Sequence, residues 1–208
     1  DAARTSELHP MDDPVMQFPR QDDGQLVGLL SEAQKQAAVL EPKINALHGL
    51  LVKGLPDRPK LKPDEKRWQA GYDLALGRVL AVKVRTEAYN AMLAAAKRGM
   101  KFTDPKSDTW QLVPSDEVSM SLVGAPLSRD AEQAKEFLHR VVAEHPGTPW
   151  AKIAAEELKT PLGYEWRDIH TGVNAPKPAG GGGGNPNRGD DKRRMLAPPK
   201  PKRPVKNL

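Results

Sequence analysis

The sequence predicts an all-α protein made of a long antiparallel helical hairpin, a smaller helical hairpin and a disordered C-terminal tail. First, apolar residues recur in steps of three and four over residues 25–52 and 64–98, as they do on one face of a helix. Second, helix-start and helix-stop residues bound two shorter segments, 128–145 and 149–159. Third, proline, glycine and basic residues dominate residues 169–208.

Residues 1–24 are predicted to be a linker that arrives from an upstream domain. Three prolines and scattered aspartates interrupt this segment, and its apolar residues follow no period. The chain also opens without methionine, which favours a fragment of a longer protein. The helical domain is therefore assigned to residues 25–168.

The first long helix is predicted from an apolar face that persists for about four heptads. Its members are Leu26, Leu30, Ala33, Ala37, Leu40, Ile44, Leu47 and Leu51. Pro42 interrupts the pattern, because proline lacks the backbone donor and crowds the preceding turn. We therefore expect a kink or a break near Glu41.

The second long helix is predicted to begin at Asp64, as the N-cap, and to end near Gly99. Its apolar seam comprises Trp68, Tyr72, Ala75, Val79, Val82, Tyr89, Leu93 and Ala96, with Thr86 as the polar member. The connection to the first helix is short and rich in glycine and proline, so the two helices should pair antiparallel. With the two seams facing each other, replacing Val82 by Asp would be strongly destabilising.

Residues 99–127 follow no clear pattern, although Thr109–Pro114 is compatible with a short extended piece. Ser128 and Pro146 bound the third helix, while Thr148 and Pro149 have the arrangement of a new helix start. In that arrangement Trp150 lies in the first turn of the fourth helix, where we expect it to pack on the third.

The net charge of +5 resides in the C-terminal tail. Residues 173–208 hold nine basic and two acidic residues, so residues 1–172 are slightly acidic. Seven prolines and six glycines in the same segment leave almost nothing apolar to bury, which predicts disorder. The tail has no aromatic residue on which a base could stack, so specific nucleic-acid recognition is not expected.

Composition excludes several classes of function. The absence of cysteine excludes disulfide scaffolds, thiolate metal sites and cysteine nucleophiles, and no apolar run is long enough to span a membrane. Glu136 and His139 form one Glu-x-x-His, whereas a di-metal helical bundle needs two such motifs and two more glutamates. No serine-nucleophile or phosphate-loop motif is present. The sequence therefore predicts no catalytic residue, no metal site and no cofactor.

Aromatic residues near the C-terminal end of the helical region have two interpretations. Trp150, Tyr164 and Trp166 cluster around the last helical hairpin in the sequence. Their favoured role is core packing. The alternative is that they contact a partner, because aromatic anchors also dominate protein interfaces.

Two resemblances support this architecture. Residues 131–158, with the turn His145-Pro-Gly-Thr-Pro149, resemble a tetratricopeptide-type helix pair of the kind found in bacterial envelope lipoproteins. Residues 67–78, 84–90, 145–151 and 160–163 resemble the C-terminal region of large, uncharacterised bacterial von Willebrand factor A (vWA) domain-containing proteins. That resemblance implies an A domain upstream and leans towards the bacterial cell envelope. The A-domain metal motif, Asp-x-Ser-x-Ser, is absent from this chain.

The functional prediction is a non-enzymatic protein-interaction or scaffold region of a larger vWA-domain protein. Its partner would be another protein or the upstream A domain. An alternative is polyanion or nucleic-acid binding through the basic tail, with electrostatic contacts from Lys192, Arg193, Arg194, Lys200, Lys202 and Arg203. A third hypothesis, a di-metal helical enzyme, depends on Glu136 and His139 alone.

Overall fold

The described part of the chain has a mixed α/β fold, so the all-α prediction is wrong. A computed structural model describes residues 14–54, 66–117 and 120–175. In chain order the elements are β1 (Gln17–Pro19), α2 (Asp23–Ala38), α3 (Glu41–Gly54), α4 (Lys66–Lys97), β2 (Thr109–Ser115), α5 (Met120–Glu144), α6 (Pro149–Glu157) and β3 (Gly163–Ile169).

Three short strands form an antiparallel sheet in the order β1-β2-β3. Phe18 of β1 lies opposite Trp110, and Trp166 of β3 lies opposite Leu112. Each strand contributes only a few side chains to the core, so no alternation long enough to recognise appears in the sequence. The sheet depends on pairing between segments far apart along the chain, which helical periodicity cannot reveal.

The sheet also corrects the predicted flanks. β1 and the N-cap of α2, Asp22, fall within residues assigned to a linker, and Ile169 pairs with Thr109 where the tail was predicted to begin. The side chain of Asp22 accepts a hydrogen bond from the backbone nitrogen of Gln25. Residues 1–13 of the predicted linker and residues 176–208 of the predicted disordered tail lie outside the described residues.

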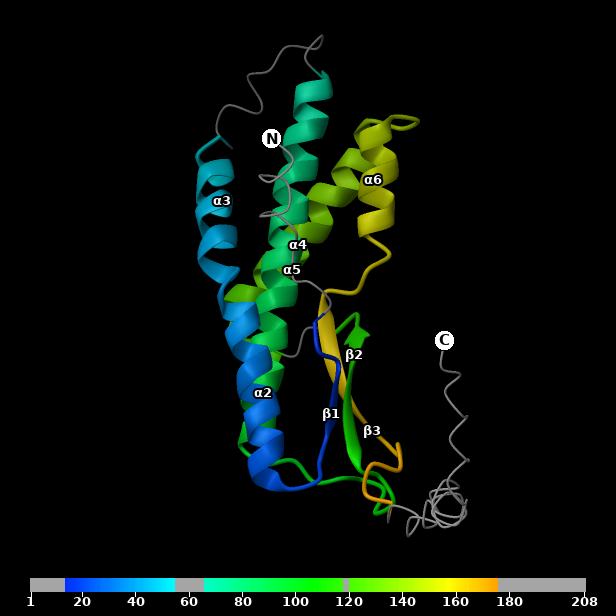
Figure 1. The fold of residues 1–208 in the computed structure, drawn as a ribbon. Coiled ribbons are helices and arrows are strands. Elements are labelled where there is room, and N and C mark those ends of the chain that lie inside the picture. Colours follow the sequence, from blue (N-terminus) through cyan, green and yellow to red (C-terminus); the bar gives the residue numbers. More distant parts are fainter. Residues whose placement is uncertain (1–13, 55–65, 118–119, 176–208) are drawn as a thin grey trace, which may run out of the picture. The chain divides into compact units, whose positions relative to one another are not determined.

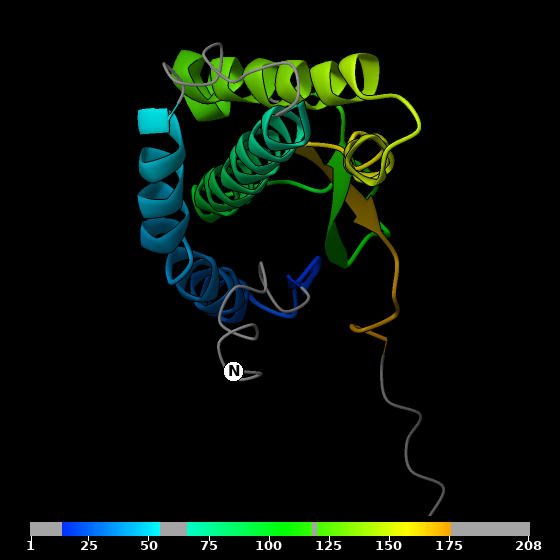
Figure 2. The same cartoon turned by 90° about the horizontal axis from the view of Figure 1, so that it is seen from above.

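Helix α4 is the central element of residues 14–173. Figures 1 and 2 show α2 and α3 along one side of α4, α5 along another, and the sheet on a third. Buried residues are therefore spread around α4 and do not form one stripe. Consequently the predicted seam is buried only in its second half, at Thr86, Tyr89, Leu93 and Ala96. Tyr72, Ala75, Val79 and Val82 are half-buried and Trp68 is exposed, whereas Val84, which lies off the predicted seam, is fully buried.

A break separates α2 from α3 where Pro42 predicts one. α2 ends at Ala38 and α3 begins at Glu41, which places Pro42 in the first turn of the new helix. In a continuous helix the ring of Pro42 would crowd the carbonyl of Ala38, four residues earlier. The break allows α2 and α3 to lie against different parts of α4.

Helix α6 follows α5 and leads into β3, and side-chain contacts hold both of its ends in place. Thr148 caps α6 by accepting a hydrogen bond from the backbone nitrogen of Ala151, as the sequence predicts. Arg85 of α4 holds the other end of α6. Its guanidinium lies 2.6 Å from a carboxylate oxygen of Glu157 and donates to the carbonyls of Thr160 and Pro161 at 3.0 Å. The chain that enters β3 is thereby tied to α4.

Candidate interaction surface

Helix α3 packs less completely than any other helix whose side chains are described. It has fourteen residues, several of them aliphatic, and none of its side chains is buried. Stable helices in globular proteins normally bury an apolar face against a neighbour. The incomplete burial of α3 makes its outer side the candidate functional surface.

The inner side of α3 has a small apolar attachment to α4. Leu51 packs against the core cluster between α4 and α5. The hydroxyl of Tyr72 donates to the carbonyl of Leu51, and a Cβ on Gly54 would lie 3.1 Å from the Tyr72 ring. The end of α3 therefore rests on one aromatic residue of α4.

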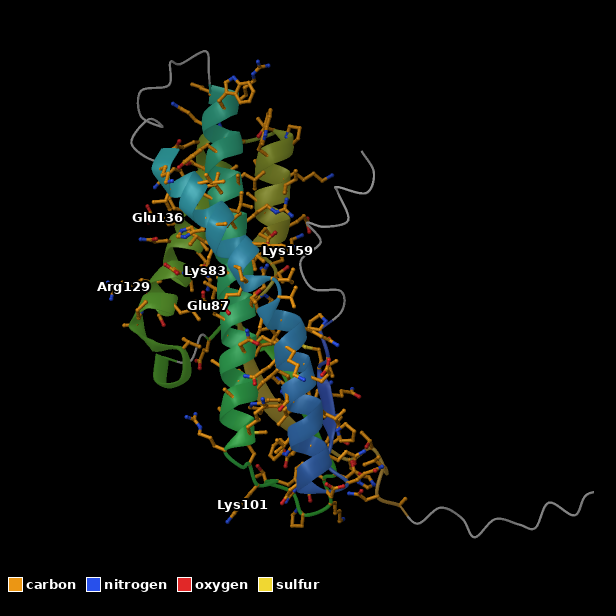
Figure 3. The ribbon with its side chains drawn as sticks, turned by 60° about the vertical axis from the view of Figure 1, so that its left-hand side comes forward. Lys83, Glu87, Lys101, Arg129, Glu136 and Lys159 are labelled. Atoms are coloured by element: carbon orange, nitrogen blue, oxygen red, sulfur yellow. The ribbon has the colours of Figure 1, made fainter. Side chains whose placement is uncertain are left out.

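A polar cluster lies where α3, α4 and α5 meet. Lys83 of α4 forms an ion pair with Asp130 of α5, and its ammonium lies 3.8 Å from Glu87. Figure 3 shows Lys83 and Glu87 on successive turns of α4. Burial raises the pKa of Glu87, with Glu41 of α3 adding to the shift and Lys83 opposing it. Burial alone would lower the pKa of Lys83. The hydrogen bond to Asp130 and the negative charges of Glu87 and Asp130 outweigh burial, so the pKa of Lys83 is raised.

His48 brings α3 into this cluster. Burial lowers the pKa of His48 below its ordinary value of 6.5, the charge of Lys83 lowers it further, and Asp130 opposes both effects. The neutral imidazole is therefore the form that suits the folded arrangement.

We expect acidification to weaken the attachment of α3. A depressed pKa means that the unfolded or undocked chain binds a proton more readily than the folded one. The contribution of His48 to stability is thus present above its ordinary pKa of 6.5 and is lost as the pH falls below it. Melting temperatures at about pH 7.5 and about pH 5.5 should differ more for the native chain than for His48→Gln, which cannot titrate in that range.

Glu87 contributes a pH dependence of the opposite sign. Because its pKa is raised, its contribution is present at low pH and is lost as the pH rises through that pKa. The comparison with His48→Gln isolates the histidine, since Glu87 is common to both chains. An equal pH dependence in the two chains would contradict the assignment to His48.

The outer side of α3 carries an apolar and basic stripe, which we call the α3 stripe. It consists of Lys43, Leu47, Leu50 and Lys53, spaced by four, three and three residues along the helix. Leu47 is 40% exposed and Leu50 is 65% exposed. The only acidic residue of α3 is Glu41, whose negative charge faces that of Glu87 on α4 and raises the pKa of Glu87. The α3 stripe is therefore apolar at its centre and positively charged at both ends.

The three aromatic residues predicted as partner contacts do not form one cluster. Trp150 packs against a core cluster that Leu138 and Val141 of α5 form with Leu74 of α4 and Ala154 of α6. Tyr164 and Trp166 lie on β3, where Tyr164 meets Tyr89 edge-on at 5.9 Å between ring centroids. Trp166 packs similarly against Phe18 and Trp110. All three are partly buried.

A second polar cluster closes the sheet end near Thr109. Asp108 is buried, and its Oδ1 accepts hydrogen bonds of 2.8 Å from both the backbone nitrogen and the hydroxyl of Thr171. Burial opposes ionisation of Asp108, but hydrogen bonds from Thr171 and Thr109 outweigh it and hold its pKa well below the ordinary value. His170 lies 3.5 Å away and contacts the carbonyl of Lys106 at 2.7 Å. This cluster joins the segment before β2 to the segment after β3. No sequence motif predicts that these two segments come together.

The remaining predictions concern metals, membranes and the tail. Glu136 pairs with Arg140 on the surface of α5, beside the exposed His139. Among residues 14–54, 66–117 and 120–175, no group of three or more potential metal ligands comes together. Within the same residues, no helix combines the length and the apolar character needed to cross a membrane. Lys192, Arg193, Arg194, Lys200, Lys202 and Arg203 lie outside the described residues.

Comparison with known proteins gives no relative: no family model, no curated protein and no solved structure matches this chain.

Proposed function

We propose that this chain is a non-enzymatic protein-interaction region that binds a partner through the α3 stripe. The observation that carries the proposal is a fourteen-residue helix with exposed leucines and no buried side chain. Leucine exposed at the centre of a helix contributes little to the fold of the free chain. Covering it with a partner would remove apolar surface from water.

The charges of the stripe indicate the chemistry of the partner. Lys43 and Lys53 flank Leu47 and Leu50, and no carboxylate of α3 lies on this side. The complementary ligand is an amphipathic helix with aliphatic residues at its centre and Asp or Glu on its flanks. We propose as well that the chain is part of a larger vWA-domain protein, as the resemblance of residues 67–78, 84–90, 145–151 and 160–163 implies.

Binding of synthetic helical peptides tests this proposal. We expect the full chain to bind a peptide with leucines at helical spacing and glutamates on both flanks, and to bind the lysine-flanked version more weakly. Leu50→Asp should lower affinity for the acidic peptide about tenfold or more, since a central aliphatic contact carries about 1.5–3 kcal/mol. Fluorescence anisotropy measures both affinities.

The matched control is Ile153→Asp, which changes an aliphatic residue of α6 that is 43% exposed. This variant should bind the acidic peptide as the native chain does. Both variants should keep the native melting temperature, because both positions are exposed. Equal loss of binding in the two variants, or no preference for the acidic peptide, would contradict the proposal.

A second candidate, polyanion binding, is favoured by the separation of charge along the chain. Residues 173–208 are strongly basic and residues 1–172 are slightly acidic. Retention of the full chain on immobilised heparin should weaken with salt and disappear when residues 176–208 are removed. Retention that survives this removal would place the polyanion site elsewhere.

A further inference from the structure

Strand β3 lies at the edge of the sheet. Among the described residues, β2 pairs with β3 along its whole length and no strand pairs with its second edge. Every second residue of such a strand directs its backbone N–H and C=O away from the sheet. An edge of this kind is a template for another strand.

The observed backbone bonds show which residues of β3 face outwards. The nitrogen of Leu112 donates to Met16 at 2.8 Å, and the nitrogen of Arg20 donates to Asp108 at 2.9 Å. Even-numbered residues of β2 therefore bond towards β1, and odd-numbered residues bond towards β3. The odd-numbered residues face Glu165 and Arg167 in the register. The backbone groups of Tyr164, Trp166 and Asp168 consequently point away from β2.

The exposed side chains of β3 are complementary to a second copy of themselves. Glu165 and Arg167 pair with each other, and their side chains are 45% and 61% exposed. An antiparallel partner strand centred on Trp166 would place Glu165 of each copy opposite Arg167 of the other. Centring on Glu165 or Arg167 would also pair outward backbone groups with one another, but it would bring like charges together. Backbone direction therefore limits the possible registers, and charge selects the one centred on Trp166.

We propose that residues Tyr164–Asp168 pair antiparallel with the same residues of a second copy and extend the sheet across a twofold axis. Trp166 of the two copies would exchange backbone hydrogen bonds at the centre, and two Glu165–Arg167 ion pairs would flank it. The backbone supplies the association, and the charges fix the register. This dimer uses β3 and leaves the α3 stripe free, so it stands independently of the proposed function.

Sedimentation velocity of the full chain over a range of concentrations tests the dimer. The native chain should shift from monomer to dimer as concentration rises. Glu165→Arg and Arg167→Glu alone should each weaken the dimer about tenfold or more, because each places two pairs of like charges in contact. The double variant, with both charges exchanged, should restore the native association.

Two controls make the result decisive. Leu50→Asp should dimerise as the native chain does, because α3 lies outside this interface. Melting curves verify that the charge variants fold, and Glu165→Gln, which removes the attraction without adding repulsion, replaces any variant that does not. A chain that remains monomeric at every concentration overturns the proposal. So does a dimer that ignores the charge variants, or one that is lost in Leu50→Asp alone.

Discussion

Replacing Val84 by Asp should lower the free energy of unfolding by about 3–5 kcal/mol, because it places an uncompensated carboxylate in the core. Val84 has no exposed surface and belongs to the cluster that joins α4 to α5. Ionised, the new carboxylate would lose its hydration, and protonated, it would still leave polar atoms without partners. The melting temperature should fall by about 10 °C or more, as measured by circular dichroism.

Val82 provides the matched control for this substitution. It lies two residues earlier on the same helix and is half-buried, so an Asp at this position can direct its carboxylate to water. Val82→Asp should therefore cost much less than Val84→Asp. The sequence ranks Val82 as the core position, and equal effects at the two sites would show that the face of α4 assigned to the core is wrong.

Replacing Gly163 by Ala should destabilise the protein by about 3 kcal/mol, a large effect for the addition of one methyl group. A Cβ at this position would overlap the backbone carbonyl oxygen of Glu117. The obstacle is backbone, so no side chain can rotate out of the way. The chain must shift where it leaves β2 and where it enters β3.

Gly28 is the control for this second substitution. It lies in α2, and a Cβ at Gly28 would meet no atom within 4 Å. Gly28→Ala should stabilise the protein by about 0.5–1 kcal/mol, because alanine favours a helix more than glycine does. Denaturant unfolding of both variants measures the difference, and a neutral result for Gly163→Ala would show that residues 116–117 lie elsewhere.

The features predicted correctly from the sequence are those with a local cause. Pro42 marks the break between α2 and α3, and Thr148 marks the start of α6, because each acts on backbone groups within four residues. The buried positions of α2, from Leu26 to Ala37, follow the predicted period because only one side of α2 is covered. Local rules fail for α4, whose neighbours cover several sides.

The sheet and the candidate surface depend on which elements of the same chain lie side by side, and the sequence does not show this. Tyr164 and Trp166 are aromatic whether they pack beside a helix or pair with a strand, so residue type alone did not locate them. Likewise Leu47 belongs to the apolar face of the first predicted helix, and only the placement of α4 shows that this side chain is 40% exposed. Periodicity identifies apolar residues, but the neighbours decide which of them are covered.

The position of the strands along the chain determines when the sheet can form. β1 begins at Gln17, yet the strand it pairs with begins at Thr109, and the sheet is complete only at Ile169. Pairs so distant require closure of long loops, which slows their formation relative to local helices. During synthesis α2, α3 and α4 are therefore expected to form first. Phe18 cannot pair with Trp110 until β2 has been synthesised. A chain released before β3 has emerged would expose the edge of β2 to other chains.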